Sequence, residues 1–407
     1  MSEQAYDVVV MGLGYIGLPT ASLLATKGMR VLGVDVKASV VETINEGAIH
    51  IVEPDLDVLV RSAVNSGNLS ASLEPVPAGV FILAVPTPFR NNHLPDISFV
   101  ESATVQIAPV LSRGDLVILE STSPVGTTER VAEILAEQRP DLVESGERLF
   151  AVAHCPERVL PGRILLELVE NDRIVGGVDP TSTERAVAFY DRFVRGEVIA
   201  TEARTAELAK LSENSFRDVN IAFANELSMI CQELDINVWE VIRLANRHPR
   251  VEILRPGPGV GGHCLAVDPW FIVASAPERA RLIRTAREVN DGKTDWVFEH
   301  VVELADKFRH PVIACLGVTY KPDIDDVRES PALKIAQRLT GELKDRAEVL
   351  SVDPNVSDAF GVKLVSLEQA LLKADLVVGL VAHREFRSVD PERLKEKIVI
   401  DTCGVFP

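Results

Sequence analysis

A glycine-rich turn lies between a short apolar segment and a helical segment near the start of the chain. Residues 7–11, Asp-Val-Val-Val-Met, have the composition of a buried strand, and a G-x-G-x-x-G sequence follows them. Glycines in this spacing allow a tight turn and a close approach of the backbone to a pyrophosphate at the start of a helix. The turn therefore predicts a dinucleotide-binding unit, and its candidate contacts are Gly12, Gly14, Tyr15, Ile16 and Gly17.

The residues after this turn complete the expected unit. An Ala/Leu-rich stretch to Lys27 predicts a helix, Gly28 predicts its end, and residues 31–35 predict a second strand. This strand ends in Asp35, where a carboxylate can accept hydrogen bonds from ribose hydroxyls. Because the same carboxylate would repel a 2′-phosphate, we expect the cofactor to be NAD rather than NADP.

Length, composition and charge limit the class of protein. With 407 residues, 46% apolar and 25% charged, the chain is expected to form two or three soluble globular domains. No apolar run approaches about 18 residues and no basic signal region opens the chain, so we expect no membrane partner. Five cysteines without a C-x-x-C pair favour a reduced, cytoplasmic compartment and no metal site. A net charge of −18 disfavours nucleic acid, so an anionic ligand would need a local basic cluster.

The alternation of strands and helices predicts an α/β fold with two doubly wound, Rossmann-like domains joined by a long central helix. Residues 1–200 are expected to form a parallel sheet, with further strands at 80–85, 116–119 and 149–153. Residues 201–300 are expected to form a central helical linker and dimerisation region that includes the Cys264 loop, because residues 205–231 predict one helix about 40 Å long at about 1.5 Å per residue. We expect this helix to support a homodimer, and another helix to cover roughly 278–291. Residues 301–407 predict the second α/β domain, which has no G-x-G-x-x-G turn.

Three strand ends of the first domain carry polar loops that contain proline. Ligands in such sheets bind beyond the carboxyl ends of the strands, which places Thr87, Thr122, Glu157 and Arg158 near the cofactor. Loop and capping roles are the alternative for each of them. On the central helix, Lys210, Asn214 and Arg217 share one face, which is either functional or a solvated stripe.

Cys264 ends a glycine- and proline-rich run that begins at Pro256. Such a loop lets the backbone pass close to a ligand and leaves the thiol little steric cover, and Asp268 follows as a possible base. Cys155, beside His154 at a strand end, is the rival nucleophile. The remaining cysteines are expected to pack in apolar surroundings.

Long segments of the chain resemble the UDP-glucose/GDP-mannose dehydrogenase family. The resemblance covers essentially the whole chain and is carried by GLGYIGLPTA, IHIVEPDL, AVPTPF, ILESTSPVG, CPERVLPG, KLSENSFRDVNIAFANELS, NVWEVIRLANRHPRV, PGPGVGGHCLAVDPWF and YKPDIDDVRESPA. The segment from His263 to Trp270 is similar to the branch that oxidises UDP-N-acetyl-D-mannosamine. UDP-N-acetylglucosamine and UDP-glucose are the alternative substrates, and a non-catalytic regulator that binds NAD and a nucleotide sugar is the alternative class.

The resemblance implies a role for each matching residue. Cys264 would be the nucleophile, Lys210, Asn214 and Asp268 would manage oxyanion and proton transfers, and Glu157 and Thr122 would help with the catalytic water. Arg328 would reach NAD. The residues that would contact the UDP-sugar are Arg158, Val159, Lys210, Asn214, Arg217, His248, Arg250, Gly261, Tyr320 and Lys321. The implied reaction is a four-electron oxidation at C6 through a thiohemiacetal and a thioester on Cys264, which yields a uronate for surface polysaccharide synthesis.

Overall fold

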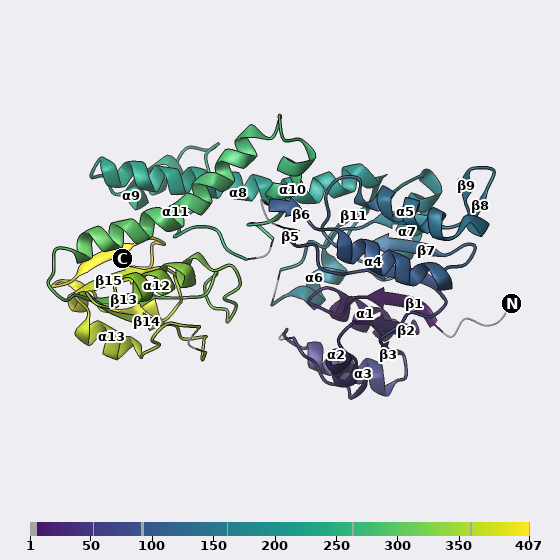
Figure 1. Ribbon diagram of the computed structural model, residues 1–407, viewed down its shortest axis with the longest axis horizontal. Helices are drawn as coiled ribbons and strands as arrows, with labels where there is room; N and C mark the ends of the chain where they lie inside the picture. Colours follow the sequence, from purple (N-terminus) through teal and green to yellow (C-terminus); the bar gives the residue numbers. More distant parts are fainter. Residues whose placement is uncertain are drawn as a thin grey trace. The chain divides into compact units, whose positions relative to one another are not determined.

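The structure is a computed structural model that describes residues 6–51, 53–90, 93–160, 162–262, 264–358 and 360–406. The chain forms two compact units, Met1–Ser212 and Glu213–Pro407, and each has its own sheet, mixed in the first unit and parallel in the second (Figure 1). The expected fold class is therefore confirmed: both units have Rossmann-like α/β topology, and a long central helix is present.

The first unit contains an eight-stranded sheet in the order β12-β11-β10-β7-β4-β1-β2-β3. In chain order the strands are β1 Tyr6–Met11, β2 Val31–Val34, β3 Leu69–Ser72, β4 Ala78–Leu83, β7 Leu116–Leu119, β10 Ala151–His154, β11 Arg173–Gly177 and β12 Val198–Glu202. The expectation of a wholly parallel sheet is wrong at one edge, because β11 pairs antiparallel with β10. β12 then pairs parallel with β11, so the last two strands run opposite to the other six. Two short hairpins, β5 Phe89–Arg90 with β6 Leu94–Pro95 and β8 Val143–Glu144 with β9 Glu147–Arg148, lie outside this sheet.

Successive side chains of the first-unit strands pack alternately into two hydrophobic clusters. Val8 and Val10 of β1 pack with apolar residues of α1, α3 and α7, whereas Val9 and Met11 pack with those of α4 and α5. A strand buried on both faces therefore reads as a continuous apolar run, which is why the sequence reveals it. The helices are α1 Gly17–Thr26, α2 Ala38–Asn45, α3 Leu56–Asn65, α4 Ser98–Ile107, α5 Thr127–Gln138, α6 Ile164–Glu170 and α7 Pro180–Tyr190.

Helix α8, Ala203–Glu233, is 31 residues long and contains the division between the units. It covers the whole predicted segment 205–231. In the second unit it is followed by α9 Val238–Ala245, α10 Asp268–Ser275 and α11 Arg281–Ala305. Helix α11 has 25 residues and continues 14 residues beyond the expected end at 291, because Val297, Phe298 and Val301 pack into the core of the second unit.

The second unit has a four-stranded parallel sheet in the order β14-β13-β15-β16. Its elements are β13 Val312–Leu316, α12 Pro331–Glu342, β14 Glu348–Val352, α13 Leu367–Lys373, β15 Leu376–Gly379 and β16 Ile398–Asp401. Helices α11 and α12 pack on one face of the sheet and α13 packs on the other (Figure 1). The side chain of Ser330 caps α12 by accepting from Leu333 N–H at 3.2 Å, as a serine before a proline leads one to expect.

Candidate active site

The first unit presents a turn whose backbone geometry fits a dinucleotide. Gly12 follows β1 with a φ of +89°, and its N–H donates to Val34 O at 2.7 Å. A Cβ on Gly17 would lie 1.8 Å from the carbonyl oxygen of Gly12, so only glycine fits this position. A Cβ on Gly14 would have no neighbour within 4 Å. That side of the turn is therefore open at the start of α1, where a pyrophosphate would meet the helix N-terminus.

Asp35 follows β2 and is fixed against the same turn. Its Oδ2 accepts from Leu13 N–H at 3.1 Å, and its Oδ1 accepts from Lys37 N–H at 3.0 Å. Tyr15 and Ile16 lie half-buried at the start of α1. A carboxylate held at the end of the second strand is where such turns bind a ribose, so the residues present fit NAD.

Side-chain hydrogen bonds connect the loops that follow β4 and β7. Thr87 Oγ1 donates to Thr122 O at 2.5 Å, and Ser121 Oγ donates to Val85 O at 2.6 Å. The two strands are parallel neighbours, and their carboxyl ends lie at the edge of the sheet where ligands bind. The structure thus brings together two of the predicted residues, Thr87 and Thr122.

Glu157 is held by a buried ion pair. Its carboxylate pairs with Arg173, and the two side chains are 6% and 3% exposed. Arg158 is half-buried and its Nη1 donates to Asp172 O at 3.2 Å. Val159 packs against the core of the first unit. The Arg173 guanidinium thus places a positive charge beside the Glu157 carboxylate, a side chain of the kind that can act as a general base.

A second buried carboxylate, which the sequence analysis missed, interacts with Glu157. Glu120 is 2% exposed, and its Oε1 accepts from the hydroxyl of Tyr190 at 2.7 Å. Its Oε2 accepts from Thr20 Oγ1 at 3.5 Å. Burial and then the charge of Glu157 raise the pKa of Glu120 to about 7. A glutamate at a strand end gives no sign of its burial in the sequence, because its partners come from α1 and α7.

Cys155, the alternative nucleophile, lies in surroundings that keep it inert. It is buried, and burial raises the pKa of its thiol to about 12. The adjacent His154 is also buried, which lowers its pKa to about 3. The imidazole therefore stays neutral and provides no positive charge to stabilise a thiolate.

In the second unit, Cys264 is exposed and follows an anchored loop. Gly257 N–H donates to Asn225 Oδ1 at 2.8 Å, and Thr294 Oγ1 donates to Pro258 O at 3.0 Å. Asn225 lies on α8 and Thr294 on α11, so both long helices hold the glycine-rich segment. The loop that the sequence identifies as open is thus fixed at its base.

Asn214 and Asp268 lie together, and Asp268 follows Cys264 by four residues along the chain. Asp268 is the first residue of α10 and is 3% exposed. Asn214 Nδ2 donates to its Oδ2 at 2.5 Å, and Asp268 N–H donates to the carbonyl oxygen of Cys264 at 2.9 Å. Three of the predicted catalytic residues are therefore connected within the second unit.

A polar network behind this loop was not predicted from the sequence. Asp218 is fully buried on α8, and its Oδ1 accepts from Arg287 Nη1 at 2.6 Å and from Asn290 Nδ2 at 2.8 Å. Asn290 Oδ1 in turn accepts from Asn225 Nδ2 at 2.8 Å. Asn214, Asp218 and Asn225 are spaced by 4 and 7 residues, so they share one face of α8. The sequence shows the spacing of these three polar residues but neither their burial nor their partners on α11.

The loop after β13 packs against the cysteine loop. Gly262 N–H donates to Arg328 O at 3.3 Å, and a Cβ on Gly262 would lie 3.0 Å from the Tyr320 ring. A Cβ on Gly261 would lie 2.7 Å from Glu329 O and 2.8 Å from Tyr320 Cβ. Glycine at 261 and 262 is therefore required for this close approach.

The other predicted residues lie outside these buried groups. Lys321 is half-buried beside Tyr320, and the Arg328 guanidinium binds the Asp326 carboxylate. Lys210 is half-buried on the part of α8 that belongs to the first unit. Three of the predicted residues are exposed basic or imidazole side chains: Arg217 on α8, and His248 and Arg250 after α9. In the part of the chain that the structure describes, no group of three or more His, Cys, Asp or Glu side chains could hold a metal ion. No helix there has both the length and the apolarity to cross a bilayer.

Family models match almost the whole chain. The UDP-glucose/GDP-mannose dehydrogenase NAD binding domain matches residues 6–194, the central domain matches 204–292 and the UDP binding domain matches 314–407. The chain belongs to the UDP-glucose/GDP-mannose dehydrogenase family. It is therefore an NAD-dependent nucleotide-sugar dehydrogenase.

Relatives within the family carry two kinds of name. An NDP-N-acetyl-D-galactosaminuronic acid dehydrogenase of Ralstonia nicotianae is 58% identical, with 98% of this chain and 96% of the relative aligned. A UDP-N-acetyl-D-mannosamine dehydrogenase of Yersinia pestis is 56% identical, with 98% and 99% aligned. Among solved structures, the UDP-D-ManNAc dehydrogenase of Pyrococcus horikoshii superposes with a TM-score of 0.88 at 41% identity, covering 98% of this chain and 96% of that one.

Proposed function

We propose that this enzyme oxidises UDP-N-acetyl-D-mannosamine at C6 to UDP-N-acetyl-D-mannosaminuronate, a precursor for a surface polysaccharide. The observation that carries the proposal is the exposed Cys264, which follows an anchored glycine loop and is connected to Asp268 and Asn214. A dehydrogenase that stopped at the aldehyde would have no use for an accessible thiol at this position. A thiol is required when the aldehyde is to be trapped and oxidised a second time.

Cys264 carries the covalent chemistry in this proposal. NAD, when bound, supplies the hydride acceptor for each of the two oxidations. After the first oxidation, the Cys264 thiolate forms a C–S bond to the aldehyde carbon, and the oxygen takes up a proton, which gives a thiohemiacetal. Loss of a hydride and a proton gives a thioester, and attack by water then releases the carboxylic acid and frees the thiol.

Polar side chains assist these steps. Asp268 accepts a hydrogen bond from Asn214, which orients its carboxylate for proton transfer beside Cys264. Lys210 stabilises the developing oxyanion. Glu157, which pairs with Arg173, activates the hydrolytic water together with Thr122. These roles follow from the chemistry of each group and from the family resemblance.

The UDP-sugar is proposed to be held mainly by basic and backbone groups. The C-terminal region matches the UDP binding domain of the family, which supports Tyr320 and Lys321 as nucleotide contacts. The remaining proposed contacts are Arg158, Val159, Arg217, His248, Arg250 and Gly261, and Arg328 is proposed to contact NAD. The basic members provide the local positive charge that a diphosphate needs in a chain with a net charge of −18.

A second candidate substrate is UDP-N-acetylgalactosamine. The 58% identical relative from Ralstonia nicotianae is named for N-acetyl-D-galactosaminuronic acid, and its identity to this chain is as high as that of the mannosamine-type relatives. The two sugars differ only in the orientation of the substituents at C2 and C4, which backbone similarity does not distinguish.

A panel of UDP-sugars tests the proposal. Initial rates of NADH formation should be measured with UDP-N-acetylmannosamine, UDP-N-acetylgalactosamine, UDP-N-acetylglucosamine and UDP-glucose. We expect kcat/KM for UDP-N-acetylmannosamine to exceed the others by about tenfold or more, equivalent to about 1.4 kcal/mol of transition-state discrimination. A higher value for UDP-N-acetylgalactosamine would establish the second candidate, and no NADH with any of the four would contradict both.

A further inference from the structure

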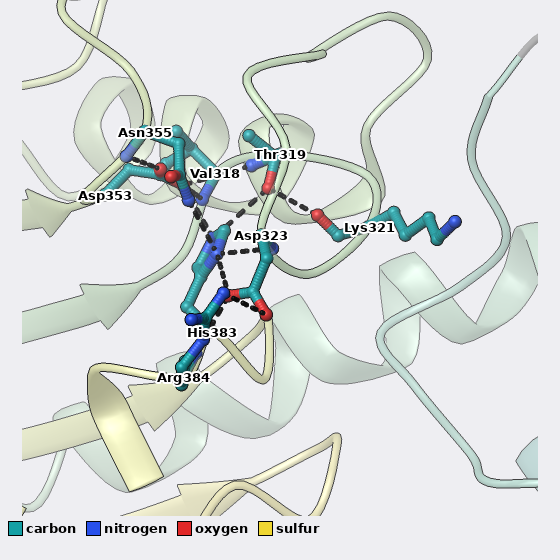
Figure 2. Close-up of polar contacts among 8 residues, drawn as sticks. All are labelled: Val318, Thr319, Lys321, Asp323, Asp353, Asn355, His383 and Arg384. Atoms are coloured by element: carbon teal, nitrogen blue, oxygen red, sulfur yellow. Dashed lines mark hydrogen bonds and ion pairs between the residues drawn. The ribbon is translucent and has the colours of Figure 1, made fainter. Parts of the chain in front are cut away.

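A buried polar cluster lies at the carboxyl edge of the second-unit sheet. It joins the loops that follow three strands: Thr319 and Asp323 after β13, Asp353 after β14 and His383 after β15 (Figure 2). Strand β13 lies between β14 and β15, so the chain passes to opposite sides of β13 at this point. Sheets of this type bind ligands where the strand order reverses in this way.

The hydrogen bonds of His383 specify one tautomer. The side chain is fully buried, and its Nδ1 accepts from Asp323 N–H at 3.0 Å and lies 3.0 Å from Asn355 Nδ2 (Figure 2). A backbone N–H cannot become an acceptor, so Nδ1 carries no proton. Nε2 therefore bears the proton and lies 3.1 Å from Asp353 Oδ2 and 3.2 Å from Thr319 Oγ1.

Asp353 repeats the position that Asp35 has in the first unit. Gly317 N–H donates to Val352 O at 2.8 Å, as Gly12 N–H does to Val34 O at 2.7 Å. Asp353 Oδ2 accepts from Val318 N–H at 2.8 Å, as Asp35 Oδ2 does from Leu13 N–H. In the second unit, however, His383 also donates to this oxygen. Burial alone would raise the pKa of Asp353, but the bonds from His383 and the loop lower it.

The imidazole holds both ends of one short segment. On one side, Thr319 Oγ1 contacts His383 Nε2 and donates to Lys321 O at 2.9 Å. On the other side, Asp323 N–H donates to Nδ1. The segment between them contains Tyr320, whose ring lies against Gly262 two residues before Cys264. One side chain thus sets the conformation of the loop that carries Tyr320 and Lys321.

We propose that His383 is a positioning residue for the nucleotide sugar, which acts by fixing the loop that presents Tyr320 and Lys321. The inference rests on the proposed function, because it takes these two residues as nucleotide contacts. A neutral imidazole suits the task, since it offers a donor to Asp353 and an acceptor to Asp323 at the same time. Neither an amide nor a hydroxyl side chain offers both at this spacing.

Four variants test the proposal. His383→Ala removes both halves of the contact. His383→Gln places an amide donor near Asp353, and His383→Asn places a carbonyl acceptor near Asp323 N–H, so each restores one half. Thr319→Val removes only the hydroxyl between His383 and Lys321 O at nearly constant shape, and it decides the matter if the alanine variant does not fold. His310→Ala, at an exposed position after α11, is the matched control.

The affinity for UDP, measured by titration calorimetry without NAD, is the primary readout. We expect His383→Ala and Thr319→Val to weaken UDP binding by about tenfold or more, equivalent to about 1.4 kcal/mol, with unchanged NAD affinity. His383→Gln and His383→Asn should recover part of the loss, KM for the UDP-sugar should rise more than kcat falls, and His310→Ala should match wild type. UDP affinity within about twofold of wild type in the folded variants, or an equal loss of NAD affinity, would overturn the proposal.

Wild-type enzyme separates this inference from the proposed function. If wild type binds UDP and the variants bind it equally well, only the role of His383 is wrong. If wild type neither binds UDP nor forms NADH with any UDP-sugar, the proposed function is wrong and the role of His383 fails with it. Lys321→Ala should weaken UDP binding in the wild-type background, which confirms that the loop held by His383 contacts the nucleotide.

Discussion

At the scale of single residues, environment decides which of two cysteines can react. Cys155 is buried and burial raises its pKa to about 12, whereas Cys264 is exposed after a glycine-rich loop. The sequence favours Cys264 because glycine and proline mark an open loop, and this exposure is confirmed. Burial of Cys155 was not readable, because it depends on segments distant in the chain.

Replacement of each cysteine by alanine tests this difference. Cys264→Ala should bind NAD and the UDP-sugar with wild-type affinity, because the anchored loop remains, but it should form no uronate. Cys155→Ala is the control and should keep most of its activity, with a loss of stability of about 1–2 kcal/mol from the small cavity. Product analysis by mass spectrometry checks both. Uronate formed by Cys264→Ala at the wild-type rate would rule out the covalent route.

Glu120 provides a pH-dependent prediction at the same scale. Burial and Glu157 raise its pKa from 4.5 to about 7, so the folded protein holds a proton that the unfolded chain releases between these values. The free energy of unfolding should therefore fall as pH rises through this interval. Glu120→Gln keeps an acceptor for Tyr190 without the charge, and it should be more stable than wild type at pH 8 by about 1–3 kcal/mol.

The difference between the two proteins should shrink towards pH 5, where Glu120 is protonated in the folded state. Thermal melts at pH 5, 6, 7 and 8 measure it. The exposed Glu137→Gln variant, also in the first unit, serves as the control and should follow wild type at every pH. A constant difference between Glu120→Gln and wild type across the series would show that Glu120 does not titrate there.

At the scale of elements, the sequence predicted which segments are regular better than where they end or how they pair. Helix α8 and five strands of the first sheet, β1, β2, β4, β7 and β10, were predicted because apolar periodicity is a local property, whereas β3, β11 and β12 were not. The end of α11 was misplaced because Gly292 resembles a helix stop, yet it has open space and the helix continues on tertiary packing. The antiparallel pairing of β11 with β10 was not predicted, because the direction of a strand depends on its pairing partners.

The polar face of α8 is a further case in which local spacing does not reveal partners that are distant in the chain. Lys210, Asn214 and Arg217 were predicted from their spacing, but the fully buried Asp218 on the same helix was not. Its partner Arg287 lies 69 residues later, on α11, and is 1% exposed. A local pattern cannot reveal a partner at this distance, so the network that anchors the cysteine loop became visible only in the structure.

The buried pair predicts a large effect of a small substitution. Asp218→Asn removes the charge that compensates Arg287 at nearly constant shape, and it should destabilise the enzyme by about 3 kcal/mol. Asp291→Asn removes the second, half-exposed partner of Arg287 and should cost less than about 1 kcal/mol. Urea unfolding of both variants provides the comparison. Equal losses would contradict the assignment of Asp218 as the principal partner.

At the scale of the whole molecule, exposed apolar side chains on α8 favour a homodimer. Phe216, Phe223 and Ile230 are spaced by seven residues and are 71%, 57% and 45% exposed. A stripe of this kind on a long helix is typical of an interface. We propose that a second copy of the chain covers it.

Disruption of this stripe should yield monomers. Phe223→Asp is expected to lower the mass measured by light scattering from that of a dimer to that of one 44.4 kDa chain at micromolar concentration. Leu372→Asp, at an even more exposed apolar position on α13, should remain dimeric. A wild-type enzyme that is monomeric and fully active at assay concentration would end the proposal.

The number of NADH molecules formed from each UDP-N-acetylmannosamine tests the central claim most directly. A limiting amount of the sugar nucleotide should be converted to completion with excess NAD, and NADH should be quantified by absorbance alongside the product by mass spectrometry. A thiol that traps the aldehyde for a second oxidation predicts two NADH and one uronate for each sugar. One NADH for each sugar, with the aldehyde as the final product, would contradict the account.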